Sequence, residues 1–299
     1  MNLEDQSKRD EYGETGERLP AGLYLVATPI GAAQDISLRA LDTLRRADVI
    51  AAEDTRRAQK LMSIHGVPRA GRLLVPYHDH SNEAARNGLL AKIAEGRAVA
   101  CISDAGTPLI ADPGWKLARD AIDQDLPAIA LPGASSLLAA LCVSGLPTDR
   151  FMFAGFPPPK QAARRAEFAE LAALKATLVF YESPRRLAAC LADMAEELGP
   201  TRQAAVSREL TKLYEETRRG ALGELAQAYA DEGPPKGEIV ILIGPPEKAE
   251  VAEADLDQAL LAALKTLRVK DAAKEVAADL GLPRRDVYQR ALVLNGEKG

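Results

Sequence analysis

The sequence predicts an α/β protein with two α/β domains followed by a C-terminal helical module. Three observations lead to this fold class: short β-rich runs alternate with helical stretches from Leu23 to Pro132, a second alternating region follows Pro132, and the tail from Leu256 onward is helical throughout. A chain of 299 residues with 47% hydrophobic content can bury the cores that two such domains need. We therefore expect domains at residues 19–131 and 132–246 and a module at residues 252–299.

The two stretches that resemble targeting or membrane segments have other interpretations. The first 18 residues carry nine charged side chains and no apolar run, so we expect a flexible leader at residues 1–18 and no signal peptide. The stretch from Leu126 to Leu146 has no charged residue and is about as long as a membrane span. Pro127, Pro132 and Gly133 divide it into a strand, a turn and the start of a helix, so we predict no membrane segment.

Cysteine content and net charge limit the class of protein. The three cysteines are widely spaced and form no Cys-x-x-Cys pair, namely Cys101, Cys142 and Cys190. This pattern favours a reducing compartment, so we expect a cytoplasmic protein with no disulfide framework and no zinc site. The net charge of −5 repels nucleic acid overall, so any RNA binding requires a local basic patch.

In the first domain, strands and helices alternate as βαβ units on a mostly parallel sheet. The strand candidates are Leu23–Ala27, Val49–Ala52 and Ala98–Ile102, and the helix candidates include Ser37–Arg46 and Glu83–Glu95. Each strand candidate runs without a gap into turn-forming or acidic residues. The carboxyl ends of parallel strands meet at one edge of the sheet, which is where open α/β folds bind ligands. We therefore expect the functional site at this edge.

Three strand-end segments carry the candidate chemistry: Thr28-Pro29-Ile30-Gly31, Glu53-Asp54-Thr55-Arg56 and the stretch from Ser103 to Gly114. Glu53, Asp54 and Asp104 are the candidates for general acid/base work. For Glu53 and Asp54 beside Arg56, a helix N-cap with a salt bridge is an equally open interpretation. The chain has neither Gly-x-Gly-x-x-Gly nor a Gly-x-x-x-x-Gly-Lys-Ser/Thr loop, which disfavours hydride transfer and nucleotide hydrolysis.

The histidines do not suggest a metal site. His78 and His80 are two residues apart, and on a strand they would share one face. The spacing indicates no third ligand, so we predict no bound metal.

The second domain follows the turn at Pro132-Gly133 and ends at Gly244-Pro245-Pro246. Its strand and helix candidates are Ser135–Ser144, Thr177–Tyr181, Pro184–Leu198, Ala204–Ser207, Leu222–Ala230 and Glu238–Ile243. The tail has helix candidates at Lys270–Leu280 and Arg284–Leu294 around a tight break, which is compatible with a helix-turn-helix-like module. From Arg268 onward, seven Lys/Arg against five Asp/Glu make it the relatively basic part of the chain.

Four blocks, in this order along the chain, resemble those of the RsmI family of bacterial 16S ribosomal RNA (cytidine-2′-O)-methyltransferases: Ala27–Gly31, Ala52–Arg56, Ser103–Pro108 and Arg208–Lys212. That family belongs to the S-adenosylmethionine-dependent tetrapyrrole methylase superfamily. The resemblance runs from about Leu23 to the last residues. It implies a two-domain tetrapyrrole-methylase-like fold, S-adenosylmethionine as cofactor, and methyl transfer to the ribose 2′-hydroxyl of a cytidine in the decoding region. It further implies 16S ribosomal RNA or the small ribosomal subunit as partner, and a homodimer.

The resemblance also assigns site residues. It places Pro29, Gly106, Thr107, Ile110, Ser135 and Ser136 near the cofactor from the first domain and its exit, and Tyr181, Arg208 and Glu238 from the second. The chain departs from the family pattern at Ala32-Ala33, where Asn-Leu is usual, and at Pro132-Gly133-Ala134, where Pro-Gly-Pro is usual. We expect Asp35 to cap the following helix in place of that Asn.

An RNA-facing surface on the second domain is a further expectation. Basic residues recur there at Arg164-Arg165, Arg185-Arg186, Arg208, Lys212 and Arg218-Arg219, and Phe156 or Tyr181 could stack on a base. Two alternatives stay open: methylation of a corrin precursor, and a non-catalytic RNA-binding protein of ribosome assembly. The C-terminal module and the Arg208–Lys212 block favour RNA over a corrin.

Overall fold

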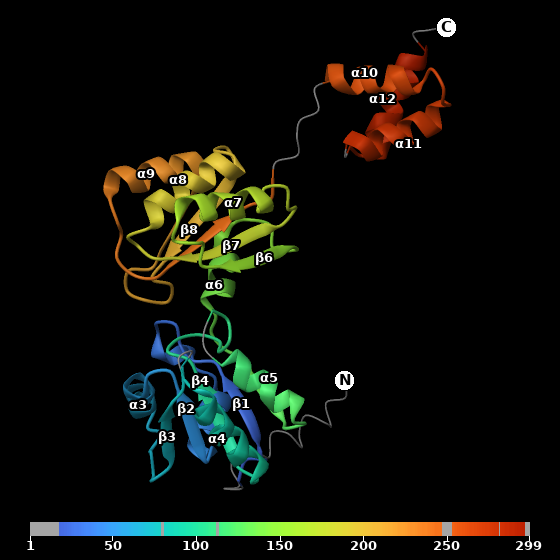
Figure 1. The fold of residues 1–299 in the computed structure, drawn as a ribbon. Coiled ribbons are helices and arrows are strands. Elements are labelled where there is room, and N and C mark those ends of the chain that lie inside the picture. Colours follow the sequence, from blue (N-terminus) through green and yellow to red (C-terminus); the bar gives the residue numbers. More distant parts are fainter. Residues whose placement is uncertain (1–17, 79–80, 112–113, 247–252, 281, 297–299) are drawn as a thin grey trace. The chain divides into compact units, whose positions relative to one another are not determined.

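The computed structural model describes residues 18–296 except residues 79–80, 112–113, 247–252 and 281. The chain forms two compact units, one that ends at Pro246 and one that holds the C-terminal helices (Figure 1). Both predicted α/β domains lie in the unit that ends at Pro246, and we call its two five-stranded sheets, each with its helices, the first and the second domain. The predicted leader, apart from Arg18, lies outside the described residues. Within the described ranges, no helix combines the length and apolar character that crossing a membrane requires.

The first sheet has five strands, all paired in parallel, which confirms the βαβ prediction. In spatial order they are β3 (Leu73–Pro76), β2 (Val49–Ala52), β4 (Ala98–Ile102), β1 (Gly22–Val26) and β5 (Ala128–Leu131). The central strands β2 and β4 are buried along their whole length because helices cover both faces. One face packs against α2 (Leu38–Arg46) and α3 (Thr55–Ile64), the other against α4 (Glu83–Ala94) and α5 (Trp115–Asp123).

The cap of α2 differs from the prediction. Ser37 is the N-cap residue, and its Oγ accepts the N–H of Ala40 at 3.1 Å. Asp35 instead ends a short 3-10 helix that begins at Ala33. The expectation that Asp35 caps α2 is therefore wrong, because a serine one residue before the helix is better placed to satisfy its free N–H groups.

The second sheet is mixed. Its spatial order is β6 (Phe151–Gly155), β7 (Thr177–Glu182), β10 (Ile239–Ile243), β8 (Gln203–Arg208) and β9 (Glu216–Ala221). Only β6 and β7 pair in parallel, and the other three pairs are antiparallel.

Alternation along β7 assigns the two faces of this sheet. Leu178 and Phe180 face the core shared with α7 (Gln161–Leu171), α8 (Leu187–Leu198) and α9 (Leu222–Glu232). Val179 and Tyr181 face the opposite side, against α6 (Ser136–Ser144). The side of the sheet that carries Tyr181 is also the side that faces the candidate site.

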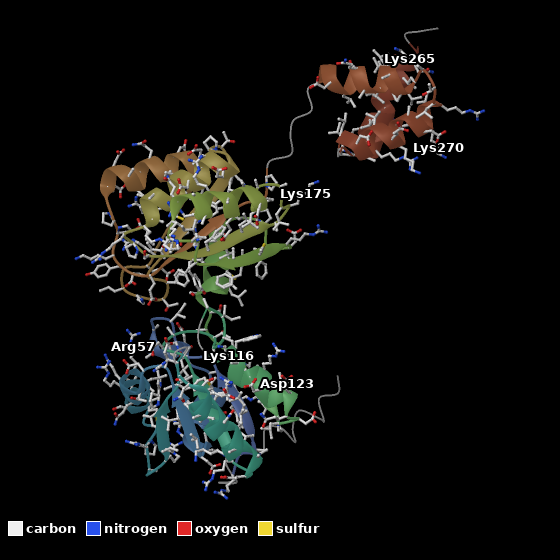
Figure 2. All side chains as sticks on the ribbon, viewed as in Figure 1. Arg57, Lys116, Asp123, Lys175, Lys265 and Lys270 are labelled. Carbon is white, nitrogen blue, oxygen red and sulfur yellow. The ribbon has the colours of Figure 1, made fainter. Side chains whose placement is uncertain are left out.

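The C-terminal unit consists of α10 (Glu253–Ala263), α11 (Val269–Leu280) and α12 (Arg284–Gly296), as the helical pattern predicts. Leu260, Val276 and Val287 are buried at their contact. Arg290 on α12 donates to both carboxylate oxygens of Asp257 on α10, which ties the first helix to the last. Figure 2 marks Lys265 and Lys270 on this unit, and both side chains are exposed.

Candidate functional site

The carboxyl ends of three parallel strands form the first-domain wall of a cleft. The register of the sheet places Val26 of β1 and Ala52 of β2 on either side of Ile102 of β4, so the segments that follow start side by side. Thr28 and Gly106 then form a backbone bridge, with a 2.9 Å N–H to O hydrogen bond in each direction. The strand-end segments therefore meet at one edge, as the sequence predicts.

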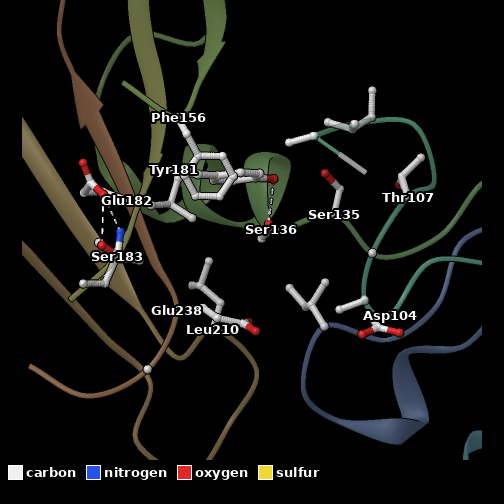
Figure 3. Close-up of a pocket in the computed structure, with 18 of the residues that line it drawn as sticks. Asp104, Thr107, Ser135, Ser136, Phe156, Tyr181, Glu182, Ser183, Leu210 and Glu238 are labelled. Carbon is white, nitrogen blue, oxygen red and sulfur yellow. Dashed lines mark hydrogen bonds between the residues drawn. The ribbon is translucent and has the colours of Figure 1, made fainter. Parts of the chain in front are cut away.

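The cleft has a volume of about 430 Å³, and both α/β domains line it. Figure 3 shows Asp104 and Thr107 on one side and Glu182 and Ser183 on the other. Nine residues predicted for the site are among those that line it: Glu53, Asp104, Gly106, Thr107, Ile110, Ser135, Ser136, Tyr181 and Glu238. The volume is within the range of small-molecule and cofactor sites.

Asp104 is the centre of a hydrogen-bonded acidic cluster on the first-domain wall. Its Oδ1 accepts the backbone N–H of Asp54 at 3.1 Å, and its Oδ2 pairs with Nη1 of Arg57 at 3.2 Å. The Asp104 N–H donates to Oε2 of Glu53 at 3.4 Å. Glu53, Arg57 and Asp104 all line the cleft. This edge therefore offers carboxylate oxygens that could accept a proton, and one guanidinium that could bind an anion.

Asp54 has a structural role. Its Oδ1 accepts the N–H of Arg56 at 2.8 Å as the N-cap of α3, and its Oδ2 pairs with the Arg56 guanidinium at 2.8 Å. The hydrogen bonds from Arg56 hold the pKa of Asp54 well below the ordinary aspartate range. Asp54 does not line the cleft, so its geometry matches the N-cap interpretation.

Two hydroxyl hydrogen bonds hold the segment between the two sheets against both walls of the cleft. The Thr107 hydroxyl donates to the carbonyl oxygen of Ala134 at 3.1 Å. Ser136 Oγ at the start of α6 and the Tyr181 hydroxyl on β7 are 2.8 Å apart and share a hydrogen bond (Figure 3). The chain segment that leaves the first domain is thereby attached to the second-domain wall.

The remaining walls are largely apolar. Ile30, Ile110 and Leu210 line the cleft, and Ile110 is flanked by Leu109 and Ala111 with positive φ angles of 74° and 55°. Non-glycine residues seldom adopt this conformation, and where they do, it is often at a ligand site. Two residues of the same predicted stretch, Asp112 and Pro113, are outside the described ranges.

An aromatic pair forms the other apolar part of the cleft. The Phe156 ring meets the Tyr181 ring edge-on at 5.5 Å between centroids, and Phe156 is 58% exposed. Such an exposed ring beside a hydroxyl-bearing ring could stack on a planar group of a ligand.

Two predicted cofactor residues are not among the lining residues. Pro29 is in the turn after β1, where its neighbour Ile30 lines the cleft instead. Arg208 ends β8, and its Nε donates to Oε2 of Glu216 on β9 at 2.6 Å. Their assignment to the cofactor stays a prediction.

The polar lining residues that the sequence reasoning missed are Arg57 on α3, Glu182 at the end of β7 and Ser183 after it. Oε1 of Glu182 accepts the Ser183 N–H at 2.6 Å, and its Oε2 pairs with Arg186 at 3.0 Å. The Glu182 side chain is fully buried, while the residue still lines the cleft. Glu182 and Ser183 follow the predicted strand at Thr177–Tyr181 directly, so the strand-end argument used for the first domain would have found them.

Most of the basic residues expected to face RNA in the second domain are bonded within the domain. Arg164 pairs with Asp193 in the interior, and Arg218 with Glu216 and Glu232. The others engaged in this way are Arg165, Arg186, Arg208, Lys212 and Arg219. Of this set, only Arg185 has no described ion pair or hydrogen bond. The prediction of a segregated cationic surface is therefore weakened, because paired guanidinium groups are less free to bind phosphates.

The histidine pattern has no support as a metal site. β3 ends at Pro76, so His78 follows the strand and is not part of its alternation, and His80 lies outside the described residues. No cluster of potential metal ligands occurs among the residues whose placement is described.

Comparison with known proteins gives two family matches. Residues 22–226 match the family of tetrapyrrole (corrin/porphyrin) methylases, and residues 250–295 match the RsmI C-terminal HTH domain. The Thermus thermophilus structure of uroporphyrin-III-C-methyltransferase has a TM-score of 0.53 at 24% identity, and the match covers 75% of this chain and 94% of that one.

The curated relatives include two proteins that match almost the whole chain and are each named ribosomal RNA small subunit methyltransferase I. The protein from Mesorhizobium japonicum is 47% identical over 94% of this chain and 95% of its own length. The protein from Erythrobacter litoralis is 49% identical over 95% of this chain and 99% of its own length.

Proposed function

Because this chain belongs to the ribosomal RNA small subunit methyltransferase I family of tetrapyrrole methylases, we propose that it methylates small-subunit ribosomal RNA. The reaction we propose moves a methyl group from S-adenosylmethionine to the ribose 2′-hydroxyl of a cytidine in the decoding region of 16S ribosomal RNA. The substrate is that RNA or the small subunit that contains it, which places the reaction in the cytoplasm.

One observation favours this substrate over a corrin precursor: the similarity continues through the C-terminal helices. The RsmI C-terminal HTH domain matches residues 250–295, whereas the match to the uroporphyrin methyltransferase structure covers only 75% of the chain. An added helical unit with exposed cations has a clear use on a polyanionic substrate and none on a small tetrapyrrole. Lys265, Arg268, Lys270, Lys274, Arg284 and Arg285 are exposed there and have no described ion pair.

The cleft residues fit S-adenosylmethionine. The volume of about 430 Å³ is sufficient for a ligand of this size, and Ile30, Ile110 and Leu210 offer apolar walls for its adenosine part. The carboxylate of Glu238 is a partner for positive charge, which the methionine ammonium and the sulfonium carry. When bound, this cofactor supplies an already activated methyl group.

The protein then has to align the ribose hydroxyl with the methyl group and exclude water from the cleft. Walls from two domains can hold the ribose oxygen in line with the bond to the methyl group, and such positioning is worth roughly 7–11 kcal/mol of barrier. Phe156, exposed at the cleft, could stack on the target base or a neighbouring base. Arg57, with its side chain 65% exposed, could contact a phosphate of the same strand.

A carboxylate that takes the ribose proton would add about 10²–10⁴ in rate. Of the three candidates from the sequence, Glu53 and Asp104 line the cleft, while Asp54 caps α3. We therefore propose Glu53 or Asp104 as the base. Glu53→Gln and Asp104→Asn should lower kcat far more than cofactor affinity, and a kcat unchanged in both variants would exclude a carboxylate base at this edge.

The experiment that tests the function has three arms. Mass-spectrometric mapping of small-subunit RNA from cells with and without the protein should show one ribose methylation missing. Calorimetric titration should show uptake of S-adenosylmethionine, which a non-catalytic assembly protein has no reason to bind. Truncation after Pro246 should preserve that uptake and weaken RNA binding, with a less negative salt slope by about 0.7–0.9 per lost phosphate contact.

Unchanged methylation in cells without the protein would refute the proposed function. Loss of cofactor uptake on truncation, with RNA affinity unchanged, would refute the role of the helical unit in RNA binding.

A further inference from the structure

The block Arg208–Lys212 continues from β8 into a turn with an unusual backbone. Glu209 and Thr211, within the turn formed by residues 209–212, have positive φ angles of 50° and 63°. Side chains disfavour this left-handed region, most of all the β-branched side chain of threonine. Such a conformation persists only where surrounding contacts determine it, and it is common at ligand sites. The contacts on either side of the 209–212 turn therefore hold it in this conformation.

On one side, the turn is bonded to the second-domain wall of the cleft. The N–H of Glu209 donates to the carbonyl oxygen of Glu238 at 3.1 Å, and the N–H of Glu238 donates to Oε1 of Glu209 at 3.2 Å. Nζ of Lys212 bridges the two carboxylates, at 2.9 Å from Glu209 Oε1 and 3.1 Å from Glu238 Oε2. A Cβ atom at Gly237 would overlap the Glu209 side chain, so only glycine permits this approach. Glu238 lines the cleft, and Lys212 holds its carboxylate.

On its other side, the turn reaches the first domain. Thr211 Oγ1 accepts the backbone N–H of Ala32 at 3.0 Å, in the segment that follows β1. A Cβ atom at Gly31 would lie 2.5 Å from Thr211 Oγ1 and 2.9 Å from the carbonyl oxygen of Leu210. Backbone cannot yield cheaply at such a distance, so the absence of a side chain at Gly31 permits this contact between the domains.

We propose that the 209–212 turn is an interdomain brace that sets the width of the cofactor cleft, with Thr211 and Lys212 as positioning residues. Thr211 fixes the turn to the first-domain edge, beside Ile30, while Lys212 fixes Glu238 at the second-domain edge. Neither Thr211 nor Lys212 lines the cleft, so both act through other residues. The inference rests on the proposed function, because it assigns the cleft to S-adenosylmethionine.

The brace is compatible with the departure from the family pattern at Ala32-Ala33. At Ala32 the bond to Thr211 uses the backbone N–H, which any residue except proline supplies, so the missing Asn side chain does not remove it. The hydrogen bond from Lys212 lowers the pKa of Glu209, which keeps that carboxylate charged at neutral pH and the bridge intact.

The test compares Thr211→Val, Thr211→Ser and Lys212→Met with the wild-type protein. Valine keeps the branched shape of threonine and removes the acceptor, whereas serine keeps the acceptor. We expect Thr211→Val to raise Kd and KM for S-adenosylmethionine about 2- to 12-fold, the factor that one ordinary hydrogen bond supplies when only the binding-ready arrangement contains it. The kcat should change little. Thr211→Ser should restore the wild-type values, and Lys212→Met should raise KM in the same way.

Hydrogen exchange gives a readout that does not depend on activity. The Ala32 amide should exchange faster in Thr211→Val and at the wild-type rate in Thr211→Ser. Thr177→Val is the matched control, since it removes another threonine hydrogen bond, from Thr177 Oγ1 to the carbonyl oxygen of Pro147 at 2.6 Å. Thr177 begins β7, at the opposite end of that strand from Tyr181 and Glu182. This control should lower stability and leave cofactor affinity unchanged.

Two results would overturn the brace. One is wild-type cofactor affinity in both Thr211→Val and Lys212→Met. The other is an equal loss of affinity in Thr177→Val, which would show that general destabilisation is the cause. A wild-type protein that binds S-adenosylmethionine but leaves ribosomal RNA unmethylated would refute the proposed function alone, because the binding and exchange measurements would still decide for or against the brace.

Discussion

Replacement of Gly106 separates backbone strain from occupation of the cleft. Gly106 lines the cleft with a φ of +81°, and its N–H and carbonyl groups are both bonded to Thr28. A Cβ atom there would lie 3.4 Å from Ile30 Cγ2 and 3.8 Å from the carbonyl oxygen of Ala134, which are ordinary contacts. Alanine therefore fits in space and suffers only from the left-handed backbone, whereas a longer side chain would extend past these neighbours into the cleft.

Gly96 provides the matched control. Its φ of +87° is nearly the same, and a Cβ atom there would have no neighbour within 4 Å. Gly96 precedes β4, at the opposite edge of the sheet from the cleft. Gly96→Ala and Gly106→Ala should each lower the free energy of unfolding by about 1–2 kcal/mol, the cost of the left-handed conformation for a residue with a Cβ.

The two leucine variants have the same backbone strain and differ only in the space around the new side chain. Gly96→Leu should lose about as much stability as Gly96→Ala and bind S-adenosylmethionine like the wild type. Gly106→Leu should weaken binding by more than tenfold, which corresponds to about 1.4 kcal/mol. Urea unfolding measures the first quantity and calorimetric titration the second. Equal cofactor affinity of Gly106→Leu and Gly96→Leu would show that the cofactor does not approach Gly106.

Three further outcomes are expected. The Arg56 hydrogen bonds lower the pKa of Asp54, so its contribution to stability is present above the ordinary aspartate range and disappears as the pH falls toward the lowered pKa. Asp54→Ala should reduce the melting temperature at neutral pH and not in strong acid. Asp54→Asn should methylate RNA at the wild-type rate, and a large loss of kcat in this variant would show instead that Asp54 is the base. Cys101 and Cys190 are buried, and burial raises the pKa of Cys101 to about 12. A disulfide reagent should therefore leave both thiols unlabelled in the native protein and label them after unfolding. The helix α6 leaves Leu138 49% exposed, an apolar surface that pairing with a second copy could cover. Light scattering at micromolar concentration should therefore give twice the monomer mass of 32.0 kDa, and a monomeric mass would contradict the expected homodimer.

The first-domain half of the site could be predicted from sequence because its sheet is parallel. Buried strands such as Ala98–Ile102 are continuous apolar runs, and the carboxyl ends of all of them lie at one edge. Glu53 and Asp104 were found by this argument alone. The separate role of Asp54 could not be found, since an acidic residue before a helix is compatible both with an N-cap and with catalysis until its partners are known.

Strand β9 was missed for a different reason. Its sequence, Glu216–Ala221, has three charged residues and no large apolar one, so it lacks the alternation that identifies a strand. Pairing with β8 stabilises this strand. Its charged side chains bond to neighbouring elements, Glu216 to Arg208 on β8 and Arg218 to Glu232 on α9. These pairs engage two arginines of the predicted RNA surface, and the sequence could not indicate this because it shows charge but not its partners.

The second-domain half of the site illustrates the limit of the strand-end argument. In this mixed sheet, Ile239 at the start of β10 pairs both with Glu182 at the end of β7 and with Arg208 at the end of β8. The edge that faces the cleft therefore joins the carboxyl ends of two strands to the amino end of a third. A rule based on carboxyl ends can find Glu182 and Ser183, but Glu238 precedes its strand and was assigned only through the family resemblance. The antiparallel register brings Glu238 beside the turn after β8, where Glu209 and Lys212 bond to it. Strand direction thus explains both why Glu238 could not be derived from the sequence pattern and why the Arg208–Lys212 block lies next to the cleft.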